Sequence, residues 1–109
     1  MDRRQHQRYD LEAPLSFSWK DQRGIRQNGK GLSSNLSVGG ILVSTSDPPP
    51  NGTRIRLSVL FPSLFAGEPL TFRALAQVLR VELITKLEGR RFAATIHTFT
   101  LHNEQKDTD

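Results

Sequence analysis

The feature that most constrains the fold is the alternation of apolar and polar residues in short runs that glycine and proline separate. In residues 11–19 every odd position is apolar, from Leu11 to Trp19, while the even positions hold Glu12, Pro14 and two serines. A period of two places one side of an extended strand in a core and the other in solvent. Pro14 has no N–H to donate, so this part of the strand is expected at an edge or bulge.

The same kind of run recurs along the chain. Further strands are expected in parts of residues 24–33, at residues 41–45, 55–61 and 70–84, and around Phe92, Ala94 and Ile96. Asn28-Gly29, the proline-rich DPPPNG and residues 86–89 supply the turn signals between them. No strong amphipathic helix is visible, and the pattern predicts an all-β sandwich or barrel.

The longest predicted strand changes phase. Its apolar side chains occupy even positions from Leu70 to Val78 and odd positions from Leu79 to Leu83. Because a slip of one residue moves every later side chain to the other face, the change predicts a bulge near Val78 and Leu79. Bulges of this kind help a sheet to close into a barrel.

Length and composition favour a single domain. A chain of 109 residues fits one core, with a flexible basic arm at 1–10, a β-barrel at 11–99 and a polar tail at 100–109 that forms at most a short helix.

Cysteine is absent, which excludes disulfides and thiolate metal sites. No nucleophile elbow, phosphate loop, metal-ligand cluster or membrane-spanning run occurs, so we expect a cytoplasmic protein that is not an enzyme, with no metal and no cofactor.

Charge points to an anionic partner. The chain carries 15 Lys and Arg against 11 Asp and Glu, a net charge of +4, and eleven of its bases are arginines. The densest positive charge is RRQHQRYD at residues 3–10, on a segment with little to bury. The planar guanidinium suits phosphate oxygens and guanine edges better than an ammonium does.

A second polar segment, SSNLSVGGILV, lies directly before a predicted strand. One interpretation is a tight turn, with Asn35 in the left-handed region, Ser37 as a local cap and Gly39-Gly40 at positive φ. The other is a binding site, in which Asn35 and Ser37 present hydrogen-bonding groups and Gly40 leaves room for a ligand.

Together the two segments resemble the bipartite signature of the PilZ family, RxxxR followed by (Asp/Asn)xSxxG. Arg4 and Arg8 match the first part, and Asn35, Ser37 and Gly40 match the second. The resemblance implies a six-stranded antiparallel β-barrel, a split barrel, that binds cyclic di-GMP at these five residues. Asn35 stands where many members have Asp, which removes charge assistance from its hydrogen bond. Gly39 and Arg80 are further candidate contacts.

The residue before the first motif arginine is Arg3. In proteins that look like this one, a basic residue there accompanies two intercalated ligand molecules, so the resemblance implies an intercalated pair of cyclic di-GMP.

Arginine matches this ligand chemically, because it pairs with phosphate, hydrogen-bonds guanine O6 and N7, and stacks on the base. In an extended arm Arg4 and Arg8 lie about 13 Å apart. The hypothesis is a mobile arm that orders over the Asn35 face and changes a surface read by a downstream protein partner.

Two alternatives stay open. A basic β-barrel can bind single-stranded nucleic acid. Such proteins present exposed aromatic rings on which the nucleotide bases stack, whereas most aromatic residues here occupy the core-facing positions of the predicted strands. A PilZ-like domain can also act as a protein adaptor without any ligand. Arg54 and Arg56, on the polar side of a predicted strand, are expected to be solvated.

Overall fold

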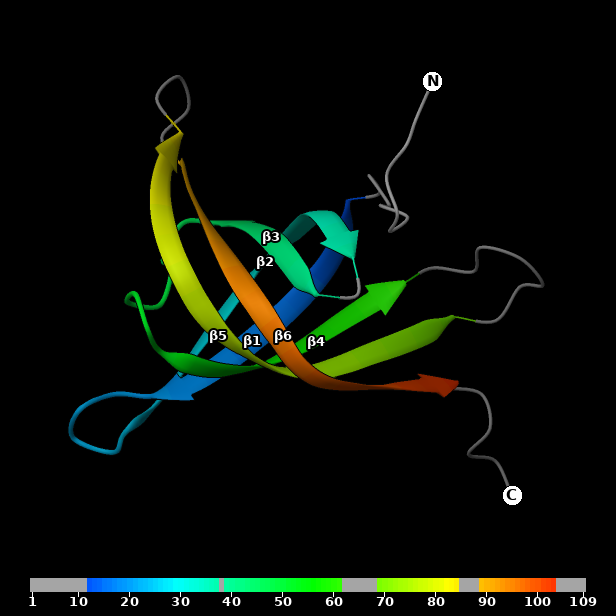
Figure 1. Ribbon diagram of the computed structural model, residues 1–109, viewed down its shortest axis with the longest axis horizontal. Helices are drawn as coiled ribbons and strands as arrows, with labels where there is room; N and C mark the ends of the chain where they lie inside the picture. Colours follow the sequence, from blue (N-terminus) through cyan, green and yellow to red (C-terminus); the bar gives the residue numbers. More distant parts are fainter. Residues whose placement is uncertain (1–11, 38, 62–68, 85–88, 104–109) are drawn as a thin grey trace.

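The computed structural model describes residues 12–37, 39–61, 69–84 and 89–103. Six β-strands are present: β1 (Ala13–Lys20), β2 (Arg26–Ser37), β3 (Gly40–Thr45), β4 (Arg54–Phe61), β5 (Leu70–Ile84) and β6 (Gly89–Asn103). They form a closed antiparallel barrel in the order β1-β2-β3-β6-β5-β4 (Figure 1). No helix occurs in these ranges, and therefore none that could cross a membrane. The prediction of an all-β, six-stranded antiparallel barrel is confirmed.

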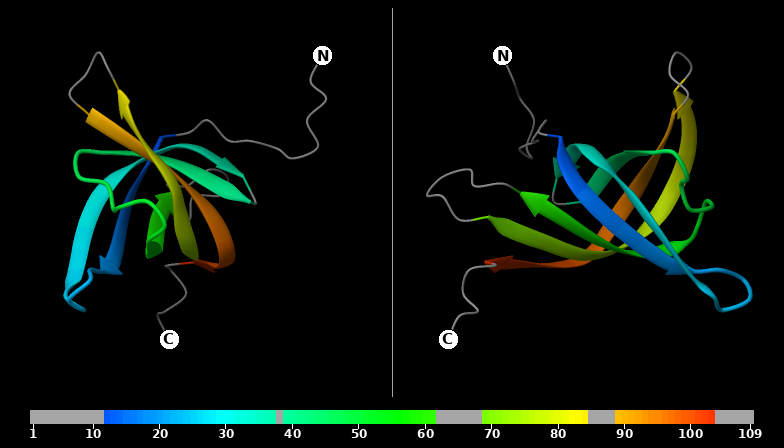
Figure 2. Two further views of the ribbon diagram at one scale, coloured as in Figure 1. Left: turned by 60° about the vertical axis from the view of Figure 1, so that its left-hand side comes forward. Right: turned by 180° about the vertical axis from the view of Figure 1, so that it is seen from behind.

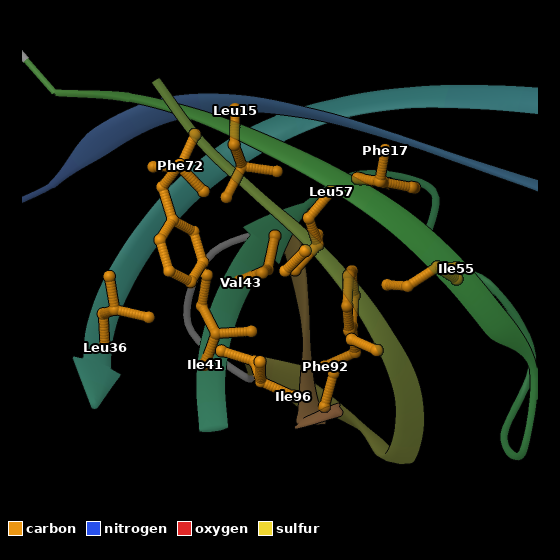
Figure 3. Close-up of a cluster of buried hydrophobic side chains, with 14 of the residues drawn as sticks. Leu15, Phe17, Leu36, Ile41, Val43, Ile55, Leu57, Phe72, Phe92 and Ile96 are labelled. Carbon is orange, nitrogen blue, oxygen red and sulfur yellow. The ribbon is translucent and has the colours of Figure 1, made fainter. Parts of the chain in front are cut away.

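Side-chain alternation builds one core inside the barrel. Buried side chains come from every strand, and Val43, Val59 and Phe92 are fully enclosed (Figure 3). Phe92 meets the ring of Phe17 edge-on at 5.4 Å between centroids. Trp19 and Phe61 pack against this core but stay partly exposed. Pro14 lies just outside the β1–β4 ladder, which begins at Leu15 and so never requires its missing N–H.

The position predicted for the first turn is wrong. Asn28 and Gly29 lie inside β2, opposite Ser18 and Phe17 of β1. The chain instead reverses before β2, where Gly24 has φ of 82°. There Asp21 Oδ1 accepts hydrogen bonds from the backbone N–H groups of Arg23 and Ile25, at 2.9 Å each, and the first of these is an Asx-turn. These contacts lower the pKa of Asp21, the Ile25 hydrogen bond most.

Three strands carry an extra residue that breaks the regular register. The extra residues are Ser34 in β2, Leu79 in β5 and His97 in β6. The phase change at Val78 and Leu79 predicted the bulge in β5, and that prediction is confirmed. Bulges bend and coil a strand, and Figures 1 and 2 show how strongly β5 and β6 curve through the molecule.

The last strand is longer than the sequence predicts. β6 continues to Asn103, and its pairing with β5 runs from Gly89 opposite Ile84 to Asn103 opposite Leu70. The first part of the predicted polar tail, residues 100–103, is therefore strand. The rest of that tail and the basic arm lie outside the described residues.

Candidate functional site

The second motif spans the hairpin between β2 and β3, with Gly39 in the turn and Asn35, Ser37 and Gly40 in the paired strands. Asn35 and Ser37 belong to β2 and pair with Leu42 and Gly40 of β3. Leu36 between them is buried, so alternation turns the Asn35 and Ser37 side chains to the outside of the barrel. Both are half-buried there. The motif thus presents its amide and hydroxyl groups on one outer surface.

The glycines of the motif do not adopt the positive φ that the tight-turn interpretation expects. Among the described residues only Gly24 and Gly52 have positive φ, so neither Gly39 nor Gly40 is used for a left-handed conformation. A Cβ on Gly40 would lie 3.2 Å from the Ala94 carbonyl oxygen of β6. Gly40 therefore allows β3 and β6 to approach closely. Gly39 has open space around its Cα, and its carbonyl accepts a hydrogen bond from the Ile96 N–H at 3.1 Å.

Strand register connects this motif to Arg80. Asn35 pairs with Leu42, Leu42 with Ala93, and Ala93 with Arg80. These four residues form one outward row across β2, β3, β6 and β5, and three strand spacings separate its ends by about 14 Å. We refer to this row, together with Ser37, Gly40 and Thr95 of the next row, as the NxSxxG face. Arg80 is thus brought onto the same surface as Asn35.

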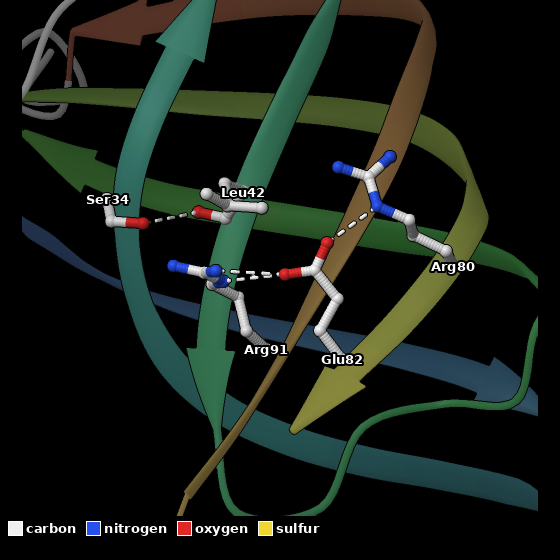
Figure 4. A network of polar contacts seen from close by, with 5 residues as sticks. All are labelled: Ser34, Leu42, Arg80, Glu82 and Arg91. Atoms are coloured by element: carbon white, nitrogen blue, oxygen red, sulfur yellow. Dashed lines mark hydrogen bonds and ion pairs between the residues drawn. The ribbon is translucent and has the colours of Figure 1, made fainter. Parts of the chain in front are cut away.

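A carboxylate holds two arginines beside the NxSxxG face (Figure 4). Arg80 Nε donates to Glu82 Oε2 at 2.6 Å, and Arg91 donates through Nε and Nη2 to Glu82 Oε1 at 3.1 and 2.9 Å. Hydrogen bonds from Arg80 first, and from Arg91, lower the pKa of Glu82. On the other side of Leu42, the Ser34 hydroxyl donates to the Leu42 carbonyl at 3.5 Å and ties the β2 bulge to β3.

Neither Glu82 nor Arg91 was among the residues singled out from the sequence. The signal that locates them is the hairpin between β5 and β6, because its register places Glu82 opposite Arg91. The two residues are nine apart in the sequence, and only counting outward from the turn brings them together.

The chain enters the barrel next to the second motif. Ala13, the first residue of β1, pairs with Ser33 of β2, and its N–H donates to Ser33 Oγ at 3.3 Å. Ser33 precedes Asn35 by two residues, or about 7 Å along a strand. Arg3, Arg4 and Arg8 lie outside the described residues. Their connection to the barrel begins beside the NxSxxG face.

No group of three or more His, Asp or Glu side chains in the described ranges is placed to hold a metal ion. The polar chemistry of the NxSxxG face consists of an amide, hydroxyls and guanidinium groups. Such donors recognise anions and the edges of bases.

The closed six-stranded barrel and the paired motif on its outer surface define a class of antiparallel β-barrel domain, and comparison with known proteins identifies its family. The family model of the PilZ domain matches residues 2–106. The chain belongs to the PilZ family. No curated protein sequence matches it significantly.

Two solved structures share the fold. The inhibitor of motility MotI/DgrA of Bacillus subtilis is 24% identical with a TM-score of 0.70, over 92% of this chain and 45% of its own. The chain thus spans less than half the length of that protein. The PilZ domain of YcgR from Escherichia coli, solved with c-di-GMP, is 19% identical with a TM-score of 0.53, over 87% of this chain and 78% of its own.

Proposed function

We propose that this protein is a cytoplasmic cyclic di-GMP receptor, not an enzyme, and that ligand binding orders the RxxxR arm over the NxSxxG face. The observation that carries the proposal is the outward, paired arrangement of Asn35, Ser37 and Gly40 in a PilZ barrel, directly beside the point where the arm joins β1. The YcgR domain with c-di-GMP shares this fold.

The arm is long enough to complete such a site. Arg8 lies five positions before Ala13, a span of at most about 18 Å when extended. Ser33, the partner of Ala13, is about 13 Å from Ser37 along β2. An extended segment of this length is sufficient for Arg8 to reach the motif, and it places Arg4, four positions earlier in the chain, within range of a second part of the same ligand.

The groups assembled in this way match the ligand chemically. Arg4 and Arg8 pair with phosphate oxygens and guanine edges, while the Asn35 amide and the Ser37 hydroxyl offer donors and acceptors to the remaining polar atoms. Arg80 lies in the same outward row as Asn35 and supplies a third guanidinium at the far side. Ordering the arm costs about 1–2 kcal/mol per residue, so several contacts must form together and the arm acts as a switch.

The first prediction tests ligand binding itself. An Arg4→Ala, Arg8→Ala double variant should bind cyclic di-GMP at least a hundredfold more weakly in a calorimeter, because each lost charge-assisted hydrogen bond contributes about 1.5–3 kcal/mol. An Arg23→Ala, Arg54→Ala variant changes the net charge equally at exposed positions away from the NxSxxG face and should bind normally. Equal affinity of wild type and the Arg4, Arg8 variant would refute the proposal.

The second prediction concerns stoichiometry. We propose that Arg3 supports an intercalated pair of ligands, since a third guanidinium can stack on or pair with the second molecule. Arg3→Ala should then reduce the number of cyclic di-GMP molecules bound per chain from two to one. The calorimetric stoichiometry measures this directly, and a count of one for the wild type would eliminate the pair.

The signal has to leave the domain through a surface that the ordered arm creates or covers. We propose that a downstream protein partner reads this surface. Hydrogen exchange of residues 1–12 with and without cyclic di-GMP measures the ordering, which should slow exchange in the ligand complex. Unchanged exchange in a chain that binds ligand would show that the arm is not the switch.

A further inference from the structure

A hollowed surface lies on the barrel outside the NxSxxG face. A groove of about 860 Å³ runs over the outer side of β1 and β4 and the adjoining halves of β2, β5 and β6. Figure 2 shows β1 crossing this side of the molecule when it is seen from behind. In β2 and β5 the bulges at Ser34 and Leu79, and in β6 the bulge at His97, separate the half that faces the groove from the half that carries the NxSxxG face.

Strand register shows how the groove is built. One outward row runs Lys30, Ser16, Ser58, Arg73 and Thr100, and the next runs Asn28, Ser18, Arg56, Leu75 and Thr98, each across β2, β1, β4, β5 and β6. In the row between them Phe17, Leu57 and Ala74 turn their side chains into the barrel, whereas Phe99 at the end of the row is 45% exposed. Short hydroxyl side chains thus form the floor, and longer side chains rise from it. We refer to this surface as the basic groove.

The basic groove carries a concentration of unpaired positive charge. A second hollow of similar size continues it through the shared residues Ser18, Arg56, Leu75 and Thr98, and adds Lys20, Arg26 and Arg54. Within the described ranges, no ion pair is recorded for any of the six Lys and Arg side chains that line the two hollows. Arg26 only donates to the Ser18 hydroxyl at 3.0 Å.

Within the part of the chain that the structure describes, acidic groups do not neutralise this surface. Of the residues that line the two hollows, Asp21 alone is acidic, and its carboxylate accepts hydrogen bonds from its own turn and from Gln27. This contrasts with the NxSxxG side of the barrel, where Glu82 holds Arg80 and Arg91. Like charges that are not paired internally repel one another and attract an external anion.

The floor of the groove distinguishes between anionic partners. Single-stranded nucleic acids need exposed aromatic rings for base stacking. Among the aromatic residues that line the two hollows, Phe17 is buried, while Trp19 and the 45% exposed Phe99 stay partly exposed. Each of these two stacks one face of its ring on a core phenylalanine, Trp19 on Phe17 at 5.8 Å and Phe99 on Phe72 at 5.2 Å between centroids, which leaves at most one face of each ring for a base. What projects between Arg56 and Arg73 is Leu75, 50% exposed. An aliphatic side chain surrounded by cations matches an acidic protein segment with an apolar residue among its carboxylates.

We propose that the basic groove is a docking surface for an acidic segment of a partner protein, whose carboxylates pair with Lys30, Arg56 and Arg73 and whose apolar side chain covers Leu75. The surface is separate from the NxSxxG face and does not depend on cyclic di-GMP. It gives the barrel a protein-binding site of its own.

The test uses the whole chain without nucleotide and a fluorescent peptide, EELEELEE, in an anisotropy titration at low salt. Arg56→Glu and Arg73→Glu should each weaken binding about fivefold to tenfold, since each change removes one attraction and adds one repulsion. The matched control Arg90→Glu makes the same charge change at an exposed residue at the start of β6 that lines neither hollow and should leave affinity within about twofold.

Further binding measurements identify the chemistry of the partner. The neutral peptide QQLQQLQQ should not bind, and Leu75→Ser should weaken EELEELEE but not the all-glutamate peptide EEEEEEEE. Thermal melts confirm that each variant is folded. Tighter binding of an oligothymidylate of equal charge would overturn the proposal in favour of nucleic acid. Equal effects of Arg56→Glu and Arg90→Glu, or no binding of EELEELEE, would also overturn it.

Discussion

At the scale of single residues, Glu82 joins two strands and two arginines. It belongs to β5, as Arg80 does, and lies opposite Arg91 of β6. Its carboxylate satisfies one guanidinium through each oxygen. Two positive charges are thereby held in fixed positions at one side of the NxSxxG face, where a free ligand phosphate would compete with Glu82 for the same donors.

The third prediction follows from the lowered pKa of Glu82. A carboxyl whose pKa is lower in the folded state stabilises the fold above its ordinary value of 4.5 and loses that contribution as pH falls through the folded pKa. The Tm of Glu82→Gln should therefore lie below that of wild type at pH 7, and the difference should shrink as the pH falls below about 4.5.

Calorimetric melts from pH 7 to pH 3 measure this difference. The matched control is Glu12→Gln, because Glu12 is exposed and no ion pair is recorded for it in the described part of the chain. Its melting temperature should follow wild type at every pH. A Glu82→Gln difference that is constant with pH would show that the ion pairs do not contribute to stability.

Sequence reasoning reached only part of the site at this scale. The spacing of Asn35, Ser37 and Gly40 singled out residues that the structure gathers on one outer surface of the barrel. The tight-turn interpretation is correct in that the chain reverses between Ser37 and Gly40 with Gly39 in the turn. The positive φ that it expected at Gly39 and Gly40 is not found. The ion pair of Glu82 and Arg91 was not predicted, because these two residues are brought together by the register of the β5–β6 hairpin and are not close in the sequence.

At the scale of elements, β2 shows why local signals failed. Asn-Gly is a strong hairpin signal, yet Gly29 lies in mid-strand and faces Phe17. A Cβ on Gly29 would come within 2.3 Å of that ring, so the glycine makes room for an aromatic side chain of the neighbouring strand. This contact joins two neighbouring strands, so it cannot be recognised from the residues that surround Gly29 in the sequence. The phase change in β5, by contrast, is visible in consecutive residues of the sequence, and the bulge that it predicted is present.

The fourth prediction concerns the same strand. A Cβ on Gly31 would lie 2.4 Å from the Ser44 carbonyl oxygen, a backbone atom held in β3. Gly31→Ala should therefore destabilise the protein by about 1–3 kcal/mol, the usual cost of forcing atoms into filled space. Gly39→Ala is the control, since nothing lies within 4 Å of its Cβ, and it should change stability by less than about 0.5 kcal/mol. Urea unfolding of both variants measures the two values, and similar values would contradict the predicted clash.

At the scale of the whole molecule, one core joins all six strands. Because the barrel is closed, no strand can leave without exposing the side chains of both its neighbours. The expected behaviour is a single cooperative transition. The fluorescence of Trp19, the sole tryptophan, should therefore report the same unfolding midpoint as the circular dichroism of the strands.

The fifth prediction is the effect of opening a cavity in that core. Phe92 is fully buried, and Phe92→Ala should cost about 3–5 kcal/mol, a large share of the roughly 5–15 kcal/mol that stabilises a typical domain. Fluorescence and circular dichroism should shift together to a lower urea concentration. Separate shifts of the two signals would mean that the barrel unfolds in parts.

The bulges in β2, β5 and β6 also bear on how such a domain can diversify. Each long strand devotes one stretch to the NxSxxG face and another to the basic groove, and a bulge lies between them. Substitutions that far apart usually combine additively. A lineage can therefore exchange the residues of one surface while inheriting the other intact, so that the proposed nucleotide site and the proposed docking surface are free to change independently in evolution.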